Sequence, residues 1–279
     1  MTPALPLCCN PEAFRLLARQ VPAIDSPDAL LQGAVAIAMH QMPNVDPAKV
    51  DATLQGYADA IRRRVRGSQP QALLAHLHAY LFDELGFIGN TENYYNTANS
   101  YLPAVLKSKR GLPITLSLIY KIVAERLGLR VHGLGLPGHF MALVELSPRE
   151  SMIVDCFAGG RILTAEQAQA AVQERFGPEL EWSDEFFAPV CNLHWLTRML
   201  QNLLHIFGGN GYYSDVAAML EMEMLLWPQQ THLQRDLALV LARIGLSQPA
   251  SMWLDKYLRD NPDDPQKSDL MQLLEVLTT

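Results

Sequence analysis

Two side chains of the sequence, His139 and Asp155, have the chemistry of a catalytic pair. A histidine held by a carboxylate is the base that activates the nucleophile in many hydrolases and acyltransferases. In several thiol enzymes that nucleophile stands at a helix N-terminus, where free N–H groups and the helix dipole stabilise negative charge. A helix upstream of His139 would therefore have to supply it.

The helix in question lies in the stretch KRGLPITLSLIYKIVAERLG, residues 109–128, and it holds no cysteine. In the transglutaminase-like core that residues 110–155 resemble, the nucleophile position, counted back from Gly128, falls on Pro113 or beside it. Proline suits the first turn of a helix, because its fixed φ is helical and its missing N–H has no partner there. Thr115 and Ser117 are the nearest hydroxyls, and they are the candidates for a displaced nucleophile.

The elements after this helix are predicted to place the pair. Apolar and polar residues alternate, as in strands, in three segments: RVHGLGL, HFMALVEL and MIVDCF. With a turn at SPRES, they predict a small antiparallel sheet. His139 is at the predicted start of one strand and Asp155 lies across a hairpin from it. A register slip of one residue would put them on opposite faces, so their contact is a testable expectation.

The first part of the chain, over residues 10–86, has the periodicity of amphipathic helices. Three of them are predicted to begin at a capping residue followed by proline: Asn10-Pro11, Ser26-Pro27 and Asp46-Pro47. The polar stretch GNTENYYNTANSY (89–101) is predicted to be a loop that lines the site. A helix capped by Thr164 follows the strands, and the segment PELEWSDEFFAPV (178–190) is predicted to be a linker.

Residues recur every 34 positions in the last third of the chain, as in the pairs Leu203 and Leu237, Gly211 and Gly245, Leu220 and Leu254, and Pro228 and Pro262. This period is typical of tetratricopeptide repeats (TPRs), in which each unit has two helices and a turn. The pattern predicts helices over 193–207, 214–226, 231–244 and 249–259, with a capping helix over 266–277.

The motifs NYYNTANSYLPAVLKSKRGLPITLSLIY, PGHF and DCFAGG, together with the repeats, resemble the bacterial SirB family over about residues 29–277. The resemblance implies an α+β fold, with a transglutaminase-like (papain-like) core that lacks the usual cysteine, followed by TPR-like helical hairpins. It implies a transglutaminase-like domain over 1–189, with a helical part over 10–86 and a core over 87–180, and a TPR-like domain over 190–279. Cys156 departs from the family pattern, which has proline after the aspartate.

The composition indicates a globular protein, since 49% of the 279 residues are apolar and 18% are charged. A net charge of −7 argues against nucleic acid and anionic membranes as partners. No apolar run reaches the roughly 18 residues of a membrane span. Four irregularly spaced cysteines argue against a disulfide framework, and the N-terminus lacks the pattern of a signal peptide, so we expect a cytoplasmic protein.

Each chemical motif also has a structural interpretation. A single histidine at a strand start is often only hydrogen-bonded, and Asp155 could bond turn amides before Gly159 and Gly160. Cys156 should face away from Asp155 and act as a small buried hydrophobe. The remaining motifs are weak: Cys191-x-x-His194 is half a zinc signature, His76 and His78 do not share a helix face, and the arginines of IRRRVRG fit a solvated helix end.

The sequence predicts a protein-interaction or regulatory module, a pseudoenzyme in which His139 and Asp155 are vestigial and Pro113 occupies the nucleophile position. Its partner is a protein or peptide, and no cofactor or metal is predicted. The alternative is a hydrolase or acyltransferase in which Thr115 or Ser117 is a displaced nucleophile served by the His–Asp pair.

Overall fold

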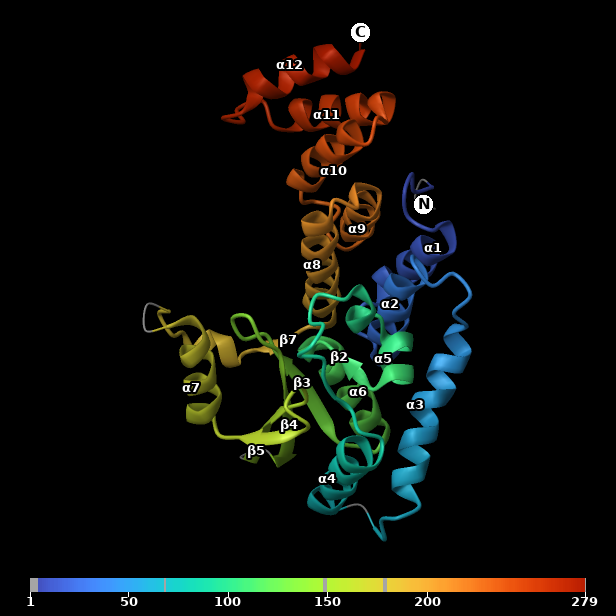
Figure 1. Ribbon diagram of the computed structural model, residues 1–279, viewed down its shortest axis with the longest axis vertical. Coiled ribbons are helices and arrows are strands. Elements are labelled where there is room, and N and C mark those ends of the chain that lie inside the picture. The colour runs from blue at the N-terminus through green and yellow to red at the C-terminus, as the bar shows by residue number, and fades with distance from the viewer. Residues whose placement is uncertain (1–4, 68, 148–149, 178–179, 279) are drawn as a thin grey trace. The chain divides into compact units, whose positions relative to one another are not determined.

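The computed structural model describes residues 5–67, 69–147, 150–177 and 180–278. Within them the chain folds into two compact units (Figure 1). One unit spans Val45–Trp195, and the other joins the residues up to Asn44 to those from Leu196 onward. This grouping differs from the predicted division at residues 189 and 190, because the first two helices have packing partners among the C-terminal helices.

The first part of the unit Val45–Trp195 is mainly helical. Its elements are α3 (Pro47–Arg62), α4 (Pro70–His78), the π-helical η2 (Ala79–Glu84), β1 (Ile88–Gly89), the 3-10 turn η3 (Thr97–Ser100), α5 (Leu102–Ser108), β2 (Arg110–Gly111) and α6 (Pro113–Arg126). The predicted cap of α3 is confirmed, since the Asp46 side chain accepts a hydrogen bond from Ala48 N. Strands β1 and β2 pair in parallel and place the loop between them beside the start of α6.

Helix α6 is buried almost all round. Every residue from Pro113 to Ala124 except Lys121 is buried, as expected for a helix that is apolar on all faces. The helix ends where the sequence predicts, because Gly128 takes a φ of +90°, which favours glycine.

The second part of this unit is an antiparallel sheet in the order β6-β5-β4-β3-β7, which confirms a small sheet after α6. Its elements are β3 (Arg130–Leu134), β4 (Met141–Ser147), β5 (Glu150–Asp155), β6 (Arg161–Leu163), α7 (Ala165–Phe176), the 3-10 turn η4 (Asp184–Phe187) and β7 (Pro189–Val190). The turn predicted at SPRES falls partly on residues 148–149, outside the described residues. Helices α6 and α7 lie on opposite sides of the sheet (Figure 1).

The segment 180–190 is part of this core, so its prediction as a linker is wrong. Leu180, Trp182, Phe186 and Phe187 pack against the cluster that Met141, Ile153 and other residues form under α7. Strand β7 also pairs with β3, where Gly133 faces Val190. The aromatic side chains of this segment bury apolar surface that a solvated linker would expose.

The second unit is all helical, with α1 (Pro11–Gln20), the 3-10 turn η1 (Val21–Ala23), α2 (Pro27–Met39), α8 (Asn192–Asn210), α9 (Tyr213–Leu226), α10 (His232–Arg243), α11 (Ser247–Asp260) and α12 (Lys267–Thr278). The predicted caps Asn10 and Ser26 accept hydrogen bonds from first-turn amides. The five helices predicted beyond residue 190 are all present. Among the described residues, no helix combines the length and apolarity that crossing a bilayer demands.

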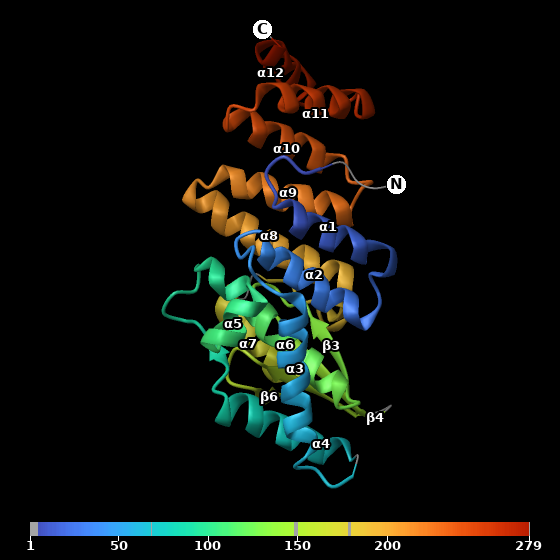
Figure 2. The same ribbon diagram turned by 90° about the vertical axis from the view of Figure 1, so that its right-hand side faces the viewer.

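The N-terminal and C-terminal helices of this unit pack closely. A Cβ at Gly33 of α2 would lie 2.5 Å from Cδ1 of Leu196 in α8, so only glycine allows this approach. Helix α1 packs on α9, and both figures show α1 and α2 alongside α8 and α9 (Figure 2). His40, just after α2, also contacts Asp215 of α9 at 2.9 Å between Nε2 and Oδ1.

Candidate functional site

The structure brings His139 and Asp155 together. Nε2 of His139 lies 3.0 Å from Oδ2 of Asp155, and the two side chains are only 14% and 13% exposed. Asp155 is the last residue of β5, whereas His139 lies in the turn before β4, which begins at Met141. The expectation that His139 opens the strand is therefore corrected, although the contact across the hairpin is present.

The second oxygen of Asp155 organises the turn that follows β5. Oδ1 accepts hydrogen bonds from the backbone N–H groups of Phe157, at 3.0 Å, and of Ala158, at 3.1 Å. Side chains of aspartate commonly close turns in this way. Asp155 thus orients the histidine and holds the turn at the same time, so the catalytic and structural interpretations describe different oxygens of one carboxylate.

The loop between β1 and α5 is tied to the start of α6. Asn99 is 3% exposed, and its Nδ2 donates to the carbonyl oxygens of Asn93 and Tyr94. Its own carbonyl accepts the N–H of Leu112, the N-cap of α6, at 3.1 Å. A second asparagine, Asn90, donates to Oδ1 of Asn99. The asparagines of this polar loop therefore place it against the helix start.

Phe157 connects this loop to the His–Asp pair. Its ring meets those of His139 and Tyr94 edge to face, at centroid distances of 6.1 Å and 5.9 Å. Its carbonyl accepts the N–H of Gly89, where an added Cβ would lie 2.5 Å from the ring. The sequence patterns considered above do not single out Phe157, and its place inside the DCFAGG motif is the signal that could have found it.

The first turn of α6 is sealed from solvent. Pro113 occupies the N1 position, and all ten residues from 111 to 120 are buried. The candidate hydroxyls Thr115 and Ser117 are both 0% exposed. The Thr115 hydroxyl has no hydrogen-bond partner among the described residues, and Ser117 lies beside the Cys156 thiol. A substrate in solution therefore has no path to either hydroxyl in this conformation.

Cys156 is buried, as the strand alternation predicts. It is 0% exposed, and burial raises the pKa of its thiol, an effect that the adjacent Ser117 hydroxyl partly opposes. A thiol with a raised pKa is a poor nucleophile at neutral pH. Its neighbour Asp155 faces the other side of the sheet, towards His139.

The other motifs have local partners. Sγ of Cys191 lies 3.0 Å from Nδ1 of His194, and the described residues hold no group of three potential metal ligands. Nε2 of His78 lies 2.9 Å from the Tyr120 hydroxyl, and burial lowers the pKa of this histidine. At the end of α3, Arg64 pairs with Glu84 and Arg62 donates to the Arg126 carbonyl, as expected for a helix end.

A small cavity of about 190 Å³ adjoins the His–Asp pair, lined by Pro137, His139, Met141, Asp155, Ala171 and Val172. Ala171 and Val172 belong to α7, and none of the lining residues comes from α6. The open side of the pair therefore faces an apolar part of α7, whose lining residues bring no nucleophile or charge to the cavity.

Comparisons with known proteins give consistent matches. The profile of the transglutaminase-like superfamily matches residues 48–201. A UPF0162 protein of Xylella fastidiosa (strain 9a5c) is 33% identical over 239 residues, 84% of each chain, and one of Vibrio cholerae is 22% identical over 73% of this chain and 76% of its own. F-box only protein 21 of Mus musculus is 29% identical over 59% of this chain and 27% of its own length. No solved structure matches the chain significantly.

Proposed function

Since the chain belongs to the transglutaminase-like superfamily and to the bacterial UPF0162 family, we propose that it is a non-catalytic binding module. It is a SirB-type protein in which the enzyme scaffold and the vestigial His139–Asp155 pair persist without a nucleophile. The scaffold then serves recognition of a polypeptide or regulation.

The observation that carries this proposal is the sealed start of α6. A nucleophile must meet its substrate, whereas Pro113 has no reactive group and the residues around it are buried. A hydroxyl also needs a base within hydrogen-bond reach, because it is protonated at neutral pH. Thr115 and Ser117 are 0% exposed, which speaks against the alternative of a displaced hydroxyl nucleophile.

The second part of the proposal is that α8 to α12 act as TPR-like repeats. Helices α8 and α9, and α10 and α11, form pairs joined by short turns in which Gly211 and Gly245 take φ values of +75° and +83°. The 34-residue spacing of these glycines supports one repeated unit per pair. Stacked helix pairs offer extended surfaces to peptides or partner helices.

We also propose that the protein works in the cytoplasm. Its four cysteines are free, and Cys191 is exposed, which suits a reducing compartment.

The match to F-box only protein 21 covers 27% of that protein. This match supports a module that also occurs as one part of a longer protein.

The test is turnover by the full chain. Wild-type protein is incubated with amide, ester and peptide substrates and with an amine donor and a glutamine-containing protein, beside His139→Ala and Thr115→Val proteins. We expect turnover no higher than that of the two variants, and no covalent labelling of Thr115 or Ser117 by a fluorophosphonate. Wild-type turnover that His139→Ala and Thr115→Val both abolish, with folding intact by circular dichroism, would favour the enzyme instead.

A further inference from the structure

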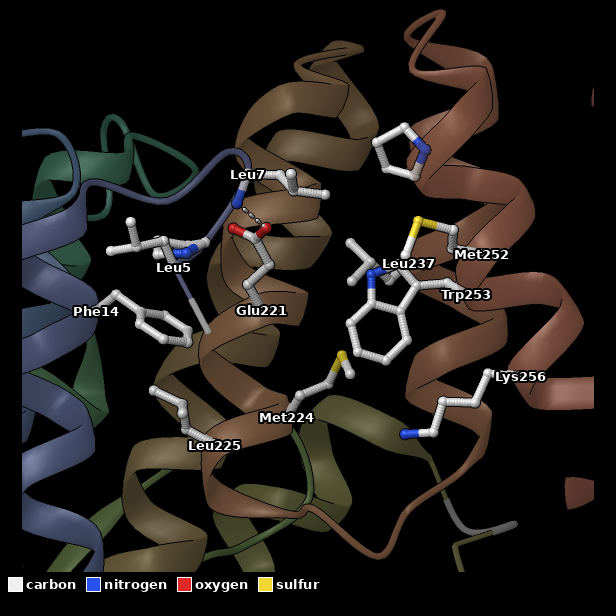
Figure 3. Close-up of a pocket in the computed structure, with 12 residues that line it drawn as sticks. Leu5, Leu7, Phe14, Glu221, Met224, Leu225, Leu237, Met252, Trp253 and Lys256 are labelled. Carbon is white, nitrogen blue, oxygen red and sulfur yellow. Dashed lines mark hydrogen bonds between the residues drawn. The ribbon is translucent and has the colours of Figure 1, made fainter. Parts of the chain in front are cut away.

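An apolar groove of about 510 Å³ lies in the helical unit (Figure 3). Its walls are the N-terminal segment 5–7, Phe14, and residues Glu221, Met224 and Leu225 of α9, Leu237 of α10, and Pro249, Met252, Trp253 and Lys256 of α11. Most of the helical lining thus comes from α9 and α11, the second helix of each pair. Met224 and Trp253 point into the same gap between these helices (Figure 3).

The four residues of α11 that line the groove lie on one face of the helix. They are Pro249, Met252, Trp253 and Lys256, and their spacing is i, i+3, i+4, i+7. Met252 is 67% exposed, although it belongs to the apolar part of this face. Exposed apolar surface that gathers in a concave region marks a binding site more often than scattered exposed residues do.

The chain's own N-terminal segment already fills one side of the groove. The buried carboxylate of Glu221 accepts the backbone N–H groups of Leu7, Cys8 and Cys9, at 2.6, 3.1 and 2.7 Å. Figure 3 shows the bond from Leu7. This clamp holds the segment in a non-helical conformation with the side chains of Leu5 and Leu7 at the groove, where they are 70% and 50% exposed. The groove therefore accepts apolar polypeptide, because Leu5 and Leu7 of the chain's own segment already lie at its wall.

The cation of the groove is Lys256. The carboxylate of Glu221 is engaged by three N–H groups, whereas the ammonium group of Lys256 lies 5.3 Å from the centre of the Trp253 ring and forms no ion pair among the described residues. A cation beside an aromatic face that is itself apolar attracts a ligand with an apolar body and a carboxylate.

We propose that this groove binds an apolar peptide segment of a partner protein that carries a carboxylate, with its apolar side chains between Met224, Met252 and Trp253 and its carboxylate at Lys256. The inference rests on the proposed binding function and deepens it, because it names the surface and the chemistry of the partner. It places the peptide beside the N-terminal segment, on the second helices of the pairs.

The experiment measures fluorescence anisotropy of the full chain with fluorescein-labelled decapeptides rich in Leu, Pro and Met, each with one Asp. Matched peptides carry Asn or Lys in place of that Asp. We expect saturable binding with a preference for Asp over Asn of about fivefold, the size of a solvent-accessible ion pair. Lys256→Glu should weaken Asp-peptide binding by about tenfold and reverse the preference towards the Lys peptides.

Two further variants sharpen the test. Lys49→Glu makes the same charge change at a lysine of α3 that is 86% exposed and outside the groove, and it should leave the affinity unchanged. Met252→Asp should abolish binding of the Asp peptides while thermal unfolding stays as in the wild type, since Met252 is largely exposed.

Equal binding of Asp, Asn and Lys peptides, or no saturable binding, would overturn the groove assignment. A dimer in sedimentation velocity that Met252→Asp disperses would overturn it too, because a second copy would then be the occupant. A protein partner that is retained equally by wild type and Lys256→Glu would leave the proposed binding function standing and remove the groove from it.

Discussion

Asp155 holds His139 with Oδ2, at 3.0 Å from Nε2, and closes the turn after β5 with Oδ1. One carboxylate therefore serves both the orientation of His139 and the fold of the turn.

The two roles of Asp155 can be separated by substitution. Asp155→Ala leaves the N–H groups of Phe157 and Ala158 without their acceptor, so we expect a loss of about 1–3 kcal/mol in the free energy of unfolding. Asp155→Asn keeps an oxygen for the turn and should cost clearly less. Urea denaturation of both variants checks this, and equal losses would mean that the turn does not depend on Oδ1.

New thiols at the helix start test whether the site is accessible. Because residues 111–120 are buried, the thiols of Pro113→Cys and Ile114→Cys should react with iodoacetamide at pH 7 more slowly than the exposed Cys191 of the same molecule. Peptide mass spectrometry compares them within one sample. Faster labelling at position 113 or 114 than at Cys191, slowed by His139→Ala, would instead reveal an open site with an active base.

Stability should fall at alkaline pH because of the buried thiol of Cys156. Burial raises its pKa above the ordinary value of 9.0, so the unfolded chain loses this proton first as the pH rises. Its contribution is therefore fully present below pH 9.0 and lost above it, by about 1.4 kcal/mol per pH unit. Urea denaturation from pH 8 to 10 should give Cys156→Ala a shallower decline than wild type, whereas Cys191→Ala should follow wild type. Parallel curves for Cys156→Ala and wild type would refute this.

Replacing two glycines by alanine should change the stability of the protein in opposite directions. At Gly89 the new Cβ would lie 2.5 Å from the Phe157 ring, so displacing that ring should cost about 1–3 kcal/mol. At Gly56 of α3 nothing lies within 4 Å, and alanine should stabilise the helix by up to about 1 kcal/mol. Thermal unfolding measures both. A neutral Gly89→Ala would show that Phe157 moves freely and does not connect the loop to His139.

The local structure could be predicted where short-range signals act alone. The capping pairs at Asn10, Ser26 and Asp46 and the glycine after α6 define helix ends through hydrogen bonds that lie within a few residues. The contact of His139 with Asp155 depends on the hairpin register, which the alternation of strand residues leaves open, and its prediction comes from the resemblance to the transglutaminase-like core.

Long-range packing could not be predicted in this way. The local pattern of residues 180–190 does not show that Trp182 and Phe186 pack under α7, because the polar residues and Pro189 resemble a linker. The clamp between Glu221 and the N–H groups of Leu7 to Cys9 joins residues more than 200 positions apart. The local signal is a pair of glutamates, Glu221 and Glu223, within the apolar stretch of α9, and buried carboxylates need partners.

The grouping of the first two helices with the last five affects how the protein is made. Helices α1 and α2 leave the ribosome first, but α8 and α9, against which they pack, are synthesised only after residues 45–195. At the usual rate of translation this interval lasts on the order of ten seconds. Leu30 and Ile37 of α2 are 1% and 0% exposed in the folded protein. During this interval the helices that bury such side chains are not yet present. The nascent chain therefore exposes this apolar surface until α8 and α9 have been synthesised.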